Sequence, residues 1–453
     1  MKKILALVIV AIMLTTLLVG CGGGDSNTIN VWSFTDEVPN AILRFQEMNP
    51  DFDYEIVVTV IGTDGGGYQE ALNAALLGGG ADAPDIFTAE AAFVLNYSQY
   101  ELAGFALPYS ELFGEPVAPL IAAAAVAPYA VELGTRPSDN EVVALPFQMT
   151  GSGFIYRRSL AIDIWGTDDP VEVGNIVGPG WDQFLVAAEE AYAHGVAMLA
   201  GEGDAWQAIR SAATSPWIVD GYLEISPERE LFFDVGYSLY NDDFTTKVAS
   251  WSEGWFAGMS GASERPILGY LGPAWLINYV MAENAGDTFG DWAITHAPVP
   301  FTWGGTWVFA NENSDESIRG GIAELIRWIT VDHSETGFQQ YFANGNLFAG
   351  SELFPDQAQY YVDGRIFKDA VGSGVVLARS DGTLDFLGGQ DMNDIFVPAG
   401  AGASGRGFGP FDETINQAFE DQATQYFMGE KTREEAFADF KAYIFDVLAI
   451  PSR

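Results

Sequence analysis

Short apolar runs and longer periodic segments alternate near the start of the chain. The apolar runs are rich in β-branched residues and predict buried strands at residues 28–32, 54–61 and 85–88. The segments after them repeat apolar residues every three or four positions, which predicts helices at residues 41–48, at 68–76 and from about residue 90. Asn49-Pro50 and the glycines at 78–80 are expected to end the first two helices. This alternation predicts a parallel sheet with helices on both faces.

Three predicted loops share one edge of that sheet, at residues 33–37, 62–67 and 89–90. Ligands bind beyond the carboxyl ends of parallel strands, which is where these loops lie. The strand ends and loops bring stacking and hydrogen-bonding side chains to one rim: Trp32, Phe34, Asp36, Thr63, Asp64 and Glu90. We expect a ligand site there. Asp36 and Glu90 have an alternative role, because acidic residues after strands often cap helices.

Later segments give more isolated signals. Gly180-Trp181 opens a predicted helix, and two helices close the chain. The second of these begins at Thr432, with Glu435 at the spacing of a capping box. Residues 372–409 are rich in glycine and are expected to be irregular. Within them, residues 400–405 match the GxGxxG spacing of dinucleotide-binding loops, but the glycines and proline that follow cannot open a helix, so we interpret the match as a loop.

The first 20 residues have the composition of an export signal. Lys2 and Lys3 precede an apolar run that is too short to span a membrane. Leu18-Val19-Gly20-Cys21 then resembles a bacterial lipobox, in which the cysteine becomes the lipidated first residue. The alternative is an ordinary signal peptide that contains a cysteine. We predict a signal peptide over residues 1–20, a lipidated tether over 21–27, and a protein that lies outside the cytoplasm and is anchored to the cell membrane through Cys21.

Composition narrows the classes of ligand. The chain has 453 residues, which implies two or three domains, and Cys21 is its only cysteine, so disulfides within the mature chain are excluded. The net charge is -42, from 62 acidic and 20 basic residues. Such a surface repels nucleic acid and disfavours anionic ligands, which leaves neutral or cationic solutes. A saline habitat would explain the acidic bias equally well.

The residues that common enzyme sites require are absent or scattered. The three histidines, His194, His296 and His333, lie far apart and lack the spacing of zinc ligands. We find neither a nucleophile elbow nor a phosphate-binding loop. We therefore expect no metal, no cofactor and no enzymatic activity. A glycoside hydrolase that uses an Asp/Glu pair stays open as an alternative, because the carboxylates are too numerous to exclude such a pair.

Tryptophan is the most informative residue type in the second half of the chain. The chain has 12 tryptophans, several of them beside glycine, as in Gly272-Pro273-Ala274-Trp275 and Trp303-Gly304-Gly305. Sugar rings stack on aromatic faces, and the cleft that binds them needs only a few polar groups. We expect four of these rings at a ligand site, with core packing as the alternative for each: Trp206, Trp251, Trp275 and Trp303. We expect three others in the core: Trp217, Trp292 and Trp328.

In order and spacing, these segments resemble the family 1 extracellular solute-binding proteins of bacterial ABC importers, the family that includes maltose-binding protein. The resemblance covers nearly the whole mature chain. Beyond the lipobox, it rests on the segments 29–32 (INVW) with Asp36, 41–50 (AILRFQEMNP), 83–86 (APDI), 145–147 (LPF), 153–158 (GFIYRR), 180–184 (GWDQF), 272–275 (GPAW), 304–307 (GGTW) and 432–437 (TREEAF).

The resemblance implies an α/β, two-lobed fold of the type II periplasmic-binding-protein kind, with a ligand cleft between the lobes. It places the crossings between lobes near residues 147–151, 298–302 and 331–335. Lobe 1 would comprise residues 28–148 and 301–333, and lobe 2 residues 149–300 and 334–453.

The resemblance also implies that five residues contact the ligand: Asp36, Glu90, Gln148, Thr150 and Trp275. Gln148 and Thr150 have the alternative role of a buried polar pair. Glu37 stands where maltose-type receptors have a basic residue, and Thr150 where they have an acid, so we do not expect the contact pattern of maltose.

The function implied is that of a lipoprotein receptor without catalysis. It would bind a neutral carbohydrate between its lobes, close around a hinge and deliver the ligand to the permease subunits of an ABC importer. We expect a monomer. The alternative ligand is another neutral or cationic polar solute.

Overall fold

A computed structural model describes residues 27–63, 66–362 and 367–453 of the chain, and it confirms the predicted alternation of strands and helices. The first elements are β1 (Thr28–Ser33), α1 (Glu37–Met48), β2 (Glu55–Val60), α2 (Gly67–Gly78) and β3 (Ile86–Glu90). β1 pairs in parallel with both β2 and β3. The next helix, α3 (Val94–Ser98), begins later than expected because residues 91–93 form a turn.

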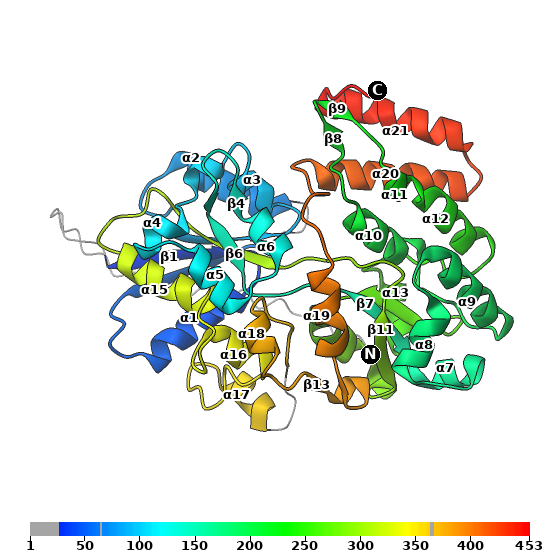
Figure 1. Cartoon of the computed structure of the whole chain (residues 1–453), viewed down its shortest axis with the longest axis horizontal. Coiled ribbons are helices and arrows are strands. Elements are labelled where there is room, and N and C mark those ends of the chain that lie inside the picture. The colour runs from blue at the N-terminus through cyan, green and yellow to red at the C-terminus, as the bar shows by residue number, and fades with distance from the viewer. Residues whose placement is uncertain (1–26, 64–65, 363–366) are drawn as a thin grey trace, which may run out of the picture.

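A five-stranded sheet in the order β2-β1-β3-β12-β6 forms lobe 1, drawn on the left of Figure 1. The added strands are β6 (Ala144–Pro146) and β12 (Thr306–Ala310). β12 runs antiparallel to both neighbours, so the prediction of a purely parallel sheet is wrong. The reason is the path of the chain. The chain leaves the lobe at the end of β6 and re-enters it at the start of β12, so the two strands run in opposite directions. The other helices before residue 334 in this lobe are α4 (Tyr109–Phe113), α5 (Ala118–Ala124), α6 (Pro128–Leu133) and α15 (Arg319–Thr330).

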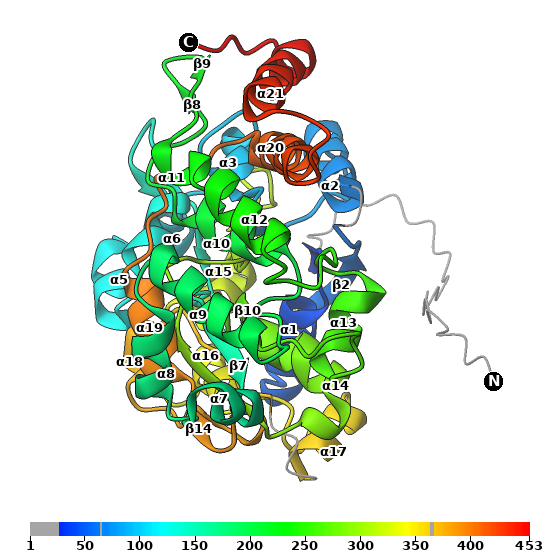
Figure 2. The ribbon, with the colours of Figure 1, turned by 90° about the vertical axis from the view of Figure 1, so that its right-hand side faces the viewer.

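Lobe 2 is built on a three-stranded antiparallel sheet in the order β10-β7-β11. These strands are β7 (Gly153–Arg157), β10 (Gly269–Gly272) and β11 (Trp292–His296). Helices that are consecutive in the chain surround this sheet, on the right of Figure 1 and in front in Figure 2: α7 (Arg158–Trp165), α8 (Pro170–Val177), α9 (Trp181–Ala193), α10 (Glu202–Ala212), α11 (Pro227–Glu230), α12 (Phe232–Asn241), α13 (Glu253–Met259) and α14 (Ala282–Asn284).

The predicted pair of closing helices is confirmed in lobe 2. They are α20 (Asp412–Phe427) and α21 (Arg433–Leu448). The Thr432 hydroxyl accepts a hydrogen bond from the backbone N–H of Glu435, and the Glu435 carboxylate accepts one from the backbone N–H of Thr432. The predicted capping box is therefore present.

Two chain segments run side by side between the sheets, at residues 147–152 and 297–305, and include two of the expected crossings. Gly151 and Thr302 form an antiparallel bridge, and the Ser152 N–H donates to the Phe301 carbonyl at 3.0 Å. A Cβ on Gly151 would lie 2.2 Å from the backbone nitrogen of Gly400 in α19 (Asn393–Ala401). Glycine is therefore required where this crossing passes the helix.

Residues 331–335 do not cross between the sheets, contrary to our expectation. Instead α16 (Phe338–Ala343) folds back on lobe 1, where Phe338 lies 5.3 Å from the rings of both Phe147 and Trp328. α17 (Pro355–Val362) and α18 (Gly374–Leu377) follow on the same side, and the Ser373 hydroxyl donates to the Ala124 carbonyl. The described residues of this segment, 334–362 and 367–377, therefore lie with lobe 1 rather than with lobe 2, because apolar side chains such as Phe338 and Val376 pack into its core.

The chain reaches the second sheet after α18. The amide of Gln390, in the short β13–β14 ribbon (Thr383–Leu384 and Gln390–Asp391), exchanges two hydrogen bonds with the backbone of Ile294 in β11. α19 then contacts β7, β11 and α18 at the centre of Figure 1. The prediction that residues 372–409 are irregular is wrong here, since they contain two helices. Residues 402–409 form no helix after the GxGxxG match, as expected.

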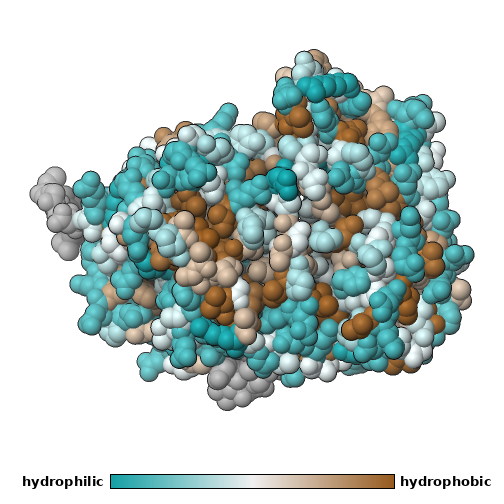
Figure 3. Space-filling view, in the orientation of Figure 1, coloured by the Kyte–Doolittle hydropathy of each residue, from teal (hydrophilic) through white to brown (hydrophobic). Residues whose placement is uncertain are grey.

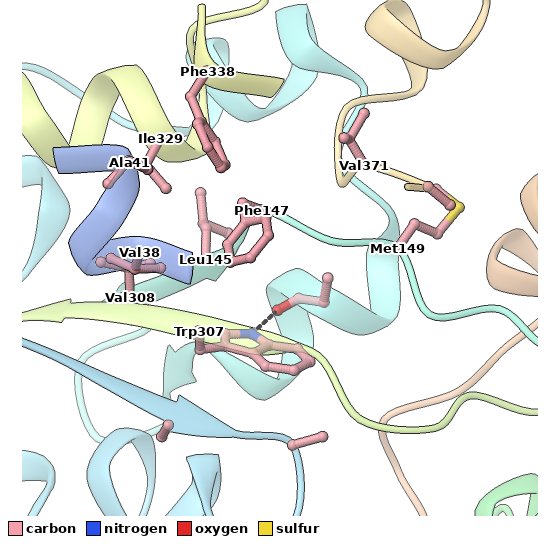
Figure 4. Packing of buried hydrophobic residues seen from close by; sticks show 14 of the residues in the cluster. Val38, Ala41, Leu145, Phe147, Met149, Trp307, Val308, Ile329, Phe338 and Val371 are labelled. Carbon is pink, nitrogen blue, oxygen red and sulfur yellow. Dashed lines mark hydrogen bonds between the residues drawn. The ribbon is translucent and has the colours of Figure 1, made fainter. Parts of the chain in front are cut away.

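The core of lobe 1 surrounds Trp307, whose indole N–H donates to the Ala130 carbonyl at 3.0 Å (Figure 4). Leu145 and Phe147 lie next to it, and the same cluster of buried residues extends to Val371. The predicted burial of three other tryptophans is confirmed: Trp217, Trp292 and Trp328. Apolar residues are scattered in small groups over the mostly hydrophilic face shown in Figure 3. None of the described helices has the length and apolar character needed to cross a membrane.

Candidate functional site

A cavity of about 780 Å³ lies between the two lobes. On the lobe 1 side, the loops that follow β1, β2 and β3 line it, as the sheet-edge argument predicted. On the lobe 2 side, α10, the loop at residue 251, the segment after β10 and the start of α20 line it. Its volume lies within the usual range for small-molecule sites, about 300–1,000 Å³.

The structure brings together eight of the residues that the sequence singled out. They come from loops and crossings that are widely separated in the chain, and all of them line this one cavity: Phe34, Asp36, Thr63, Glu90, Gln148, Trp251, Trp275 and Trp303. Asp36 occupies the N-cap position of α1 but makes no side-chain capping bond, so its exposed carboxylate stays available to the cavity. Contact of these residues with a ligand stays a prediction.

Three other predicted site residues do not line the cavity. Trp32 alternates with the inward-facing residues of β1 and packs, partly buried, against the lobe 1 core. The Thr150 hydroxyl donates to the Gly304 carbonyl at 3.1 Å, and Thr150 is a buried polar residue, which was its alternative role. Trp206 packs against Phe232 and Phe419 in the core of lobe 2. Cys21 and Asp64 lie outside the described residues.

Three tryptophan rings form one wall of the cavity, which we call the tryptophan wall: Trp251, Trp275 and Trp303. Trp275 and Trp303 meet edge to face with centroids 5.0 Å apart, and the Trp275 indole N–H donates to the Trp303 carbonyl at 2.8 Å. Trp251 lies nearly parallel to Trp275 at 6.2 Å, backed by buried Trp255. The positive φ angles of Gly304 (72°) and Gly305 (110°) turn the chain after Trp303. The wall offers apolar ring faces to a ligand.

Glu90 supplies a carboxylate beside the tryptophan wall. Its Oε2 accepts from the Ala92 N–H at 2.9 Å, which accounts for one of its oxygens. A Cβ built on Gly304 would lie 3.3 Å from the Trp275 indole nitrogen and 3.6 Å from Glu90 Oε1, so both groups flank the same backbone. Burial raises the pKa of Glu90 to about 7, with the Ala92 N–H opposing the shift and the Glu413 charge adding to it.

The lobe 2 end of the cavity contains polar residues that sequence reasoning missed. From α10 come Gln207, Arg210 and Ser211, and from α20 come Asp412, Glu413 and Asn416. The Arg210 Nε donates to the Gln207 Oε1 at 3.0 Å. Positions 207, 210 and 211 share one face of α10, and Trp206, at the edge of this face, packs against Phe232 and Phe419 instead of lining the cavity. The signal that would have found these residues is the helical spacing of polar positions, at i, i+3 and i+4 in α10 and at i, i+1 and i+4 in α20.

Asp412 is the most buried carboxylate on the cavity wall. Its side chain is 8% exposed, and its Oδ2 accepts from the Gly409 N–H at 2.9 Å. Its Oδ1 is buried without a hydrogen-bond partner among the described residues. Burial raises the pKa of Asp412 to about 7, against the lowering effect of the Arg229 charge.

The opposite end of the cavity holds Glu37, Gln148 and Tyr279. Behind them the Gln148 amide donates to the Asp369 carboxylate at 3.0 Å, and both residues are at most 5% exposed. Burial raises the pKa of Asp369 to about 8, and the Glu37 charge adds to the shift. Burial also raises the pKa of Glu37. The interaction with Tyr279 lowers this pKa, and the Asp36 charge raises it further.

The described residues offer no cluster suited to a metal ion, since no three His, Cys, Asp or Glu side chains among them are arranged to hold one. The cavity combines a wall of aromatic rings with a polar group at each end. Such an arrangement binds a ligand by stacking and hydrogen bonding between two lobes.

Comparison with known proteins connects this geometry to one family. The family model described as "Bacterial extracellular solute-binding protein" matches residues 32–332. A solved extracellular solute-binding protein of family 1 aligns with TM-score 0.70 at 16% identity, covering 91% of this chain and 97% of its own. No curated protein sequence matches the chain.

Two further solved structures are of proteins whose names state a ligand class. The galacto-N-biose-/lacto-N-biose I-binding protein of the ABC transporter from Bifidobacterium longum aligns with TM-score 0.64 at 15% identity, covering 94% of this chain and 98% of its own. The sugar-binding protein MalE from Xanthomonas citri aligns with TM-score 0.65 at 14% identity, covering 93% and 97%. The two-lobed fold expected from the sequence is confirmed.

Proposed function

This chain belongs to the bacterial extracellular solute-binding protein family, and on that premise we propose that it binds a carbohydrate in the cavity between its lobes and delivers it to an ABC importer. The observation that carries the proposal is the tryptophan wall between two polar ends, formed by residues of both lobes. The C–H faces of a sugar ring stack on indoles, and its hydroxyls bond with carboxylate and amide groups. The cavity of about 780 Å³ is roomy enough for more than one sugar ring.

The solved relatives support the ligand class. One of them is in complex with lacto-N-biose, and another is named as a sugar-binding protein. Their low identity to this chain leaves the individual sugar contacts to be decided by this chain's own residues.

The mechanism proposed is ligand-dependent closure of the two lobes. The chain passes between them at residues 147–152, 297–305 and 378–382, and a ligand that contacts both walls favours the closed arrangement. The permease would recognise the closed form. No bond of the ligand is broken in this cycle.

The proposal includes an anchor at Cys21. Lipidation there would hold the receptor at the outer face of the membrane as a monomer and raise its effective concentration near the permease. Mass spectrometry of the protein purified from membranes tests this step. An N-terminal peptide that begins with an acylated Cys21 supports it, whereas an unmodified cysteine within a longer peptide refutes it.

Isothermal titration calorimetry against a panel of oligosaccharides, followed by chromatography of the recovered sugar, tests the proposed function. We expect one ligand to bind with a stoichiometry of one and to be recovered intact. Release of shorter sugars would instead support the glycoside hydrolase. Binding of a polar solute that is not a sugar, with no sugar bound, would support the alternative ligand class.

A further inference from the structure

The loop that carries Trp251 has an unusual backbone. It links α12 to α13 over residues 242–252, and we call it the Trp251 loop. Three of its residues are not glycine and still have left-handed backbone conformations: Asp243, Lys247 and Trp251, with φ angles of 59°, 58° and 66°. Such a conformation is unfavourable for a residue with a side chain, and it persists only where the surrounding structure holds it.

The first part of the Trp251 loop is held by the backbone before α10. The Ala200 carbonyl accepts hydrogen bonds from the N–H groups of Thr246 and Val248, at 3.1 and 3.3 Å. A Cβ on Gly201 would clash with the Val248 carbonyl oxygen, so the two segments are in close contact. Trp251 lies beyond these bonds, and side chains hold that part of the loop.

Asp204 in α10 is the side chain that holds it. The Asp204 Oδ1 accepts from the Ser250 hydroxyl and from the Trp255 indole N–H, each at 3.1 Å. Ser250 directly precedes Trp251, and the Trp255 ring packs behind the Trp251 ring with centroids 5.3 Å apart. One carboxylate oxygen therefore fixes both the residue before Trp251 and the ring against which Trp251 packs.

Asp204 is remote from the ligand, and burying it is costly. It is 2% exposed and is not among the residues that line the cavity. Its Oδ2 is buried without a hydrogen-bond partner among the described residues, which costs folding free energy. Trp251 itself is half exposed, so its own packing holds it only weakly. The buried carboxylate thus supports a side chain that the cavity uses and that the core does not fix.

We propose that Asp204 is a positioning residue, which fixes Trp251 in the tryptophan wall through Ser250 and Trp255. A ring that is already ordered loses little conformational freedom when a sugar stacks on it, so loosening the Trp251 loop lowers affinity without removing a contact. The effect on affinity rests on the proposed function. The effect on the position of Trp251 does not depend on a ligand.

Fluorine NMR of the ligand-free protein labelled with 5-fluorotryptophan tests the effect on the loop. The Trp251 resonance is the one that is missing from Trp251→Phe. Ser250→Ala should move this resonance toward that of free 5-fluorotryptophan and leave the Trp328 resonance of lobe 1 unchanged. An unchanged Trp251 resonance overturns the inference. An equal change of both resonances also overturns it, since that would show a general structural role.

Ser314→Ala provides the matched control. The Ser314 hydroxyl donates to the buried carboxylate of Asp85 at 2.7 Å, in lobe 1 and outside the cavity. The control removes the same kind of hydrogen bond, and movement of the Trp251 resonance in it would overturn the inference. Asp204→Asn keeps an acceptor oxygen for both donors and should preserve the resonance, whereas Asp204→Ala should move it as Ser250→Ala does.

Calorimetric titration with maltose, cellobiose and lactose tests the effect on binding, with the disaccharide that the wild-type protein binds most tightly as the probe. Ser250→Ala should weaken its affinity about two- to tenfold, the cost of ordering one more side chain on binding. In a Trp251→Ala background the same substitution should have no further effect, because the ring on which it acts is gone.

Unchanged affinity of Ser250→Ala, or a loss that persists in the Trp251→Ala background, overturns the inference and leaves the proposed function intact. If the wild-type protein binds none of the three disaccharides, the proposed function loses support. The NMR result then still decides whether Asp204 positions Trp251.

Discussion

The indole N–H of Trp275 donates a hydrogen bond to the carbonyl oxygen of Trp303 at 2.8 Å, and the two rings meet edge to face. Trp275 follows β10 of lobe 2, whereas Trp303 belongs to the segment that crosses between the lobes. The bond therefore fixes the tryptophan wall to the hinge region. A ligand that stacks on this wall contacts the part of the chain that must bend when the lobes close.

Removal of the Trp275 ring tests the role of the wall. Trp275→Ala should weaken carbohydrate binding at least tenfold, about 1.4 kcal/mol, because a stacking surface is lost. The control is Trp165→Ala, which removes an indole from α7, outside the cavity. Titration calorimetry measures both variants. Unchanged affinity of folded Trp275→Ala would remove this residue from the site.

Trp251 adopts a left-handed backbone conformation, with φ of 66°, and is 50% exposed. Such a conformation costs an L-residue about 1–2 kcal/mol, and glycine avoids this cost. Trp251→Gly should therefore be more stable than Trp251→Ala by about 1 kcal/mol, although both variants lose carbohydrate affinity. Urea denaturation compares them. A less stable glycine variant would show that the backbone at residue 251 is not strained.

Trp206 has a structural role, and its variants should separate stability from binding. Trp206→Ala should lower the free energy of unfolding by about 3–5 kcal/mol, because the ring fills the lobe 2 core. Trp206→Phe should cost less, since it keeps an aromatic ring against Phe232 and Phe419 and removes an indole N–H that has no partner among the described residues. If Trp206→Phe folded normally but lost ligand affinity, the residue would belong to the site after all.

Asp369 should make the fold less stable as the pH rises. Its pKa is raised from 3.8 to about 8 by burial, so the folded state retains a proton that the unfolded state releases. Stability is then greatest below the unfolded pKa and falls by about 1.4 kcal/mol per pH unit up to the folded pKa. Asp369→Asn should flatten this decline. Urea unfolding at several values between about pH 5 and 8 measures it, and identical slopes in both proteins would contradict the assignment.

Sequence patterning predicted the elements whose signals are local. The strands and helices from Thr28 to Glu90 follow from apolar periodicity, and the loops that line the cavity follow from the rule that parallel strands end at one edge. The cap at Thr432 was predictable for the same reason, since its partner is three residues away.

The remaining differences depend on contacts between distant parts of the chain. The position of α16 on lobe 1 is set by Phe338 packing against Phe147, far away in the sequence. Trp206 and Arg210 lie on one helix, and only the packing of α10 decides that the tryptophan enters the core and the arginine faces the cavity. The sequence pointed to Trp206 as a site candidate and missed Arg210, because it does not show which of the two side chains the packing buries.

The most direct test of the central claim is a thermal-shift screen of the purified protein against monosaccharides, oligosaccharides, amino sugars, polyols and cationic solutes. A ligand at one hundred times its dissociation constant stabilises the folded form by about 2.7 kcal/mol, so its melting temperature must rise. We predict that a carbohydrate raises the melting temperature of the wild-type protein and raises it less in Trp275→Ala. If no carbohydrate raised the melting temperature, or if the rise were equal in both proteins, a carbohydrate site at the tryptophan wall would be contradicted.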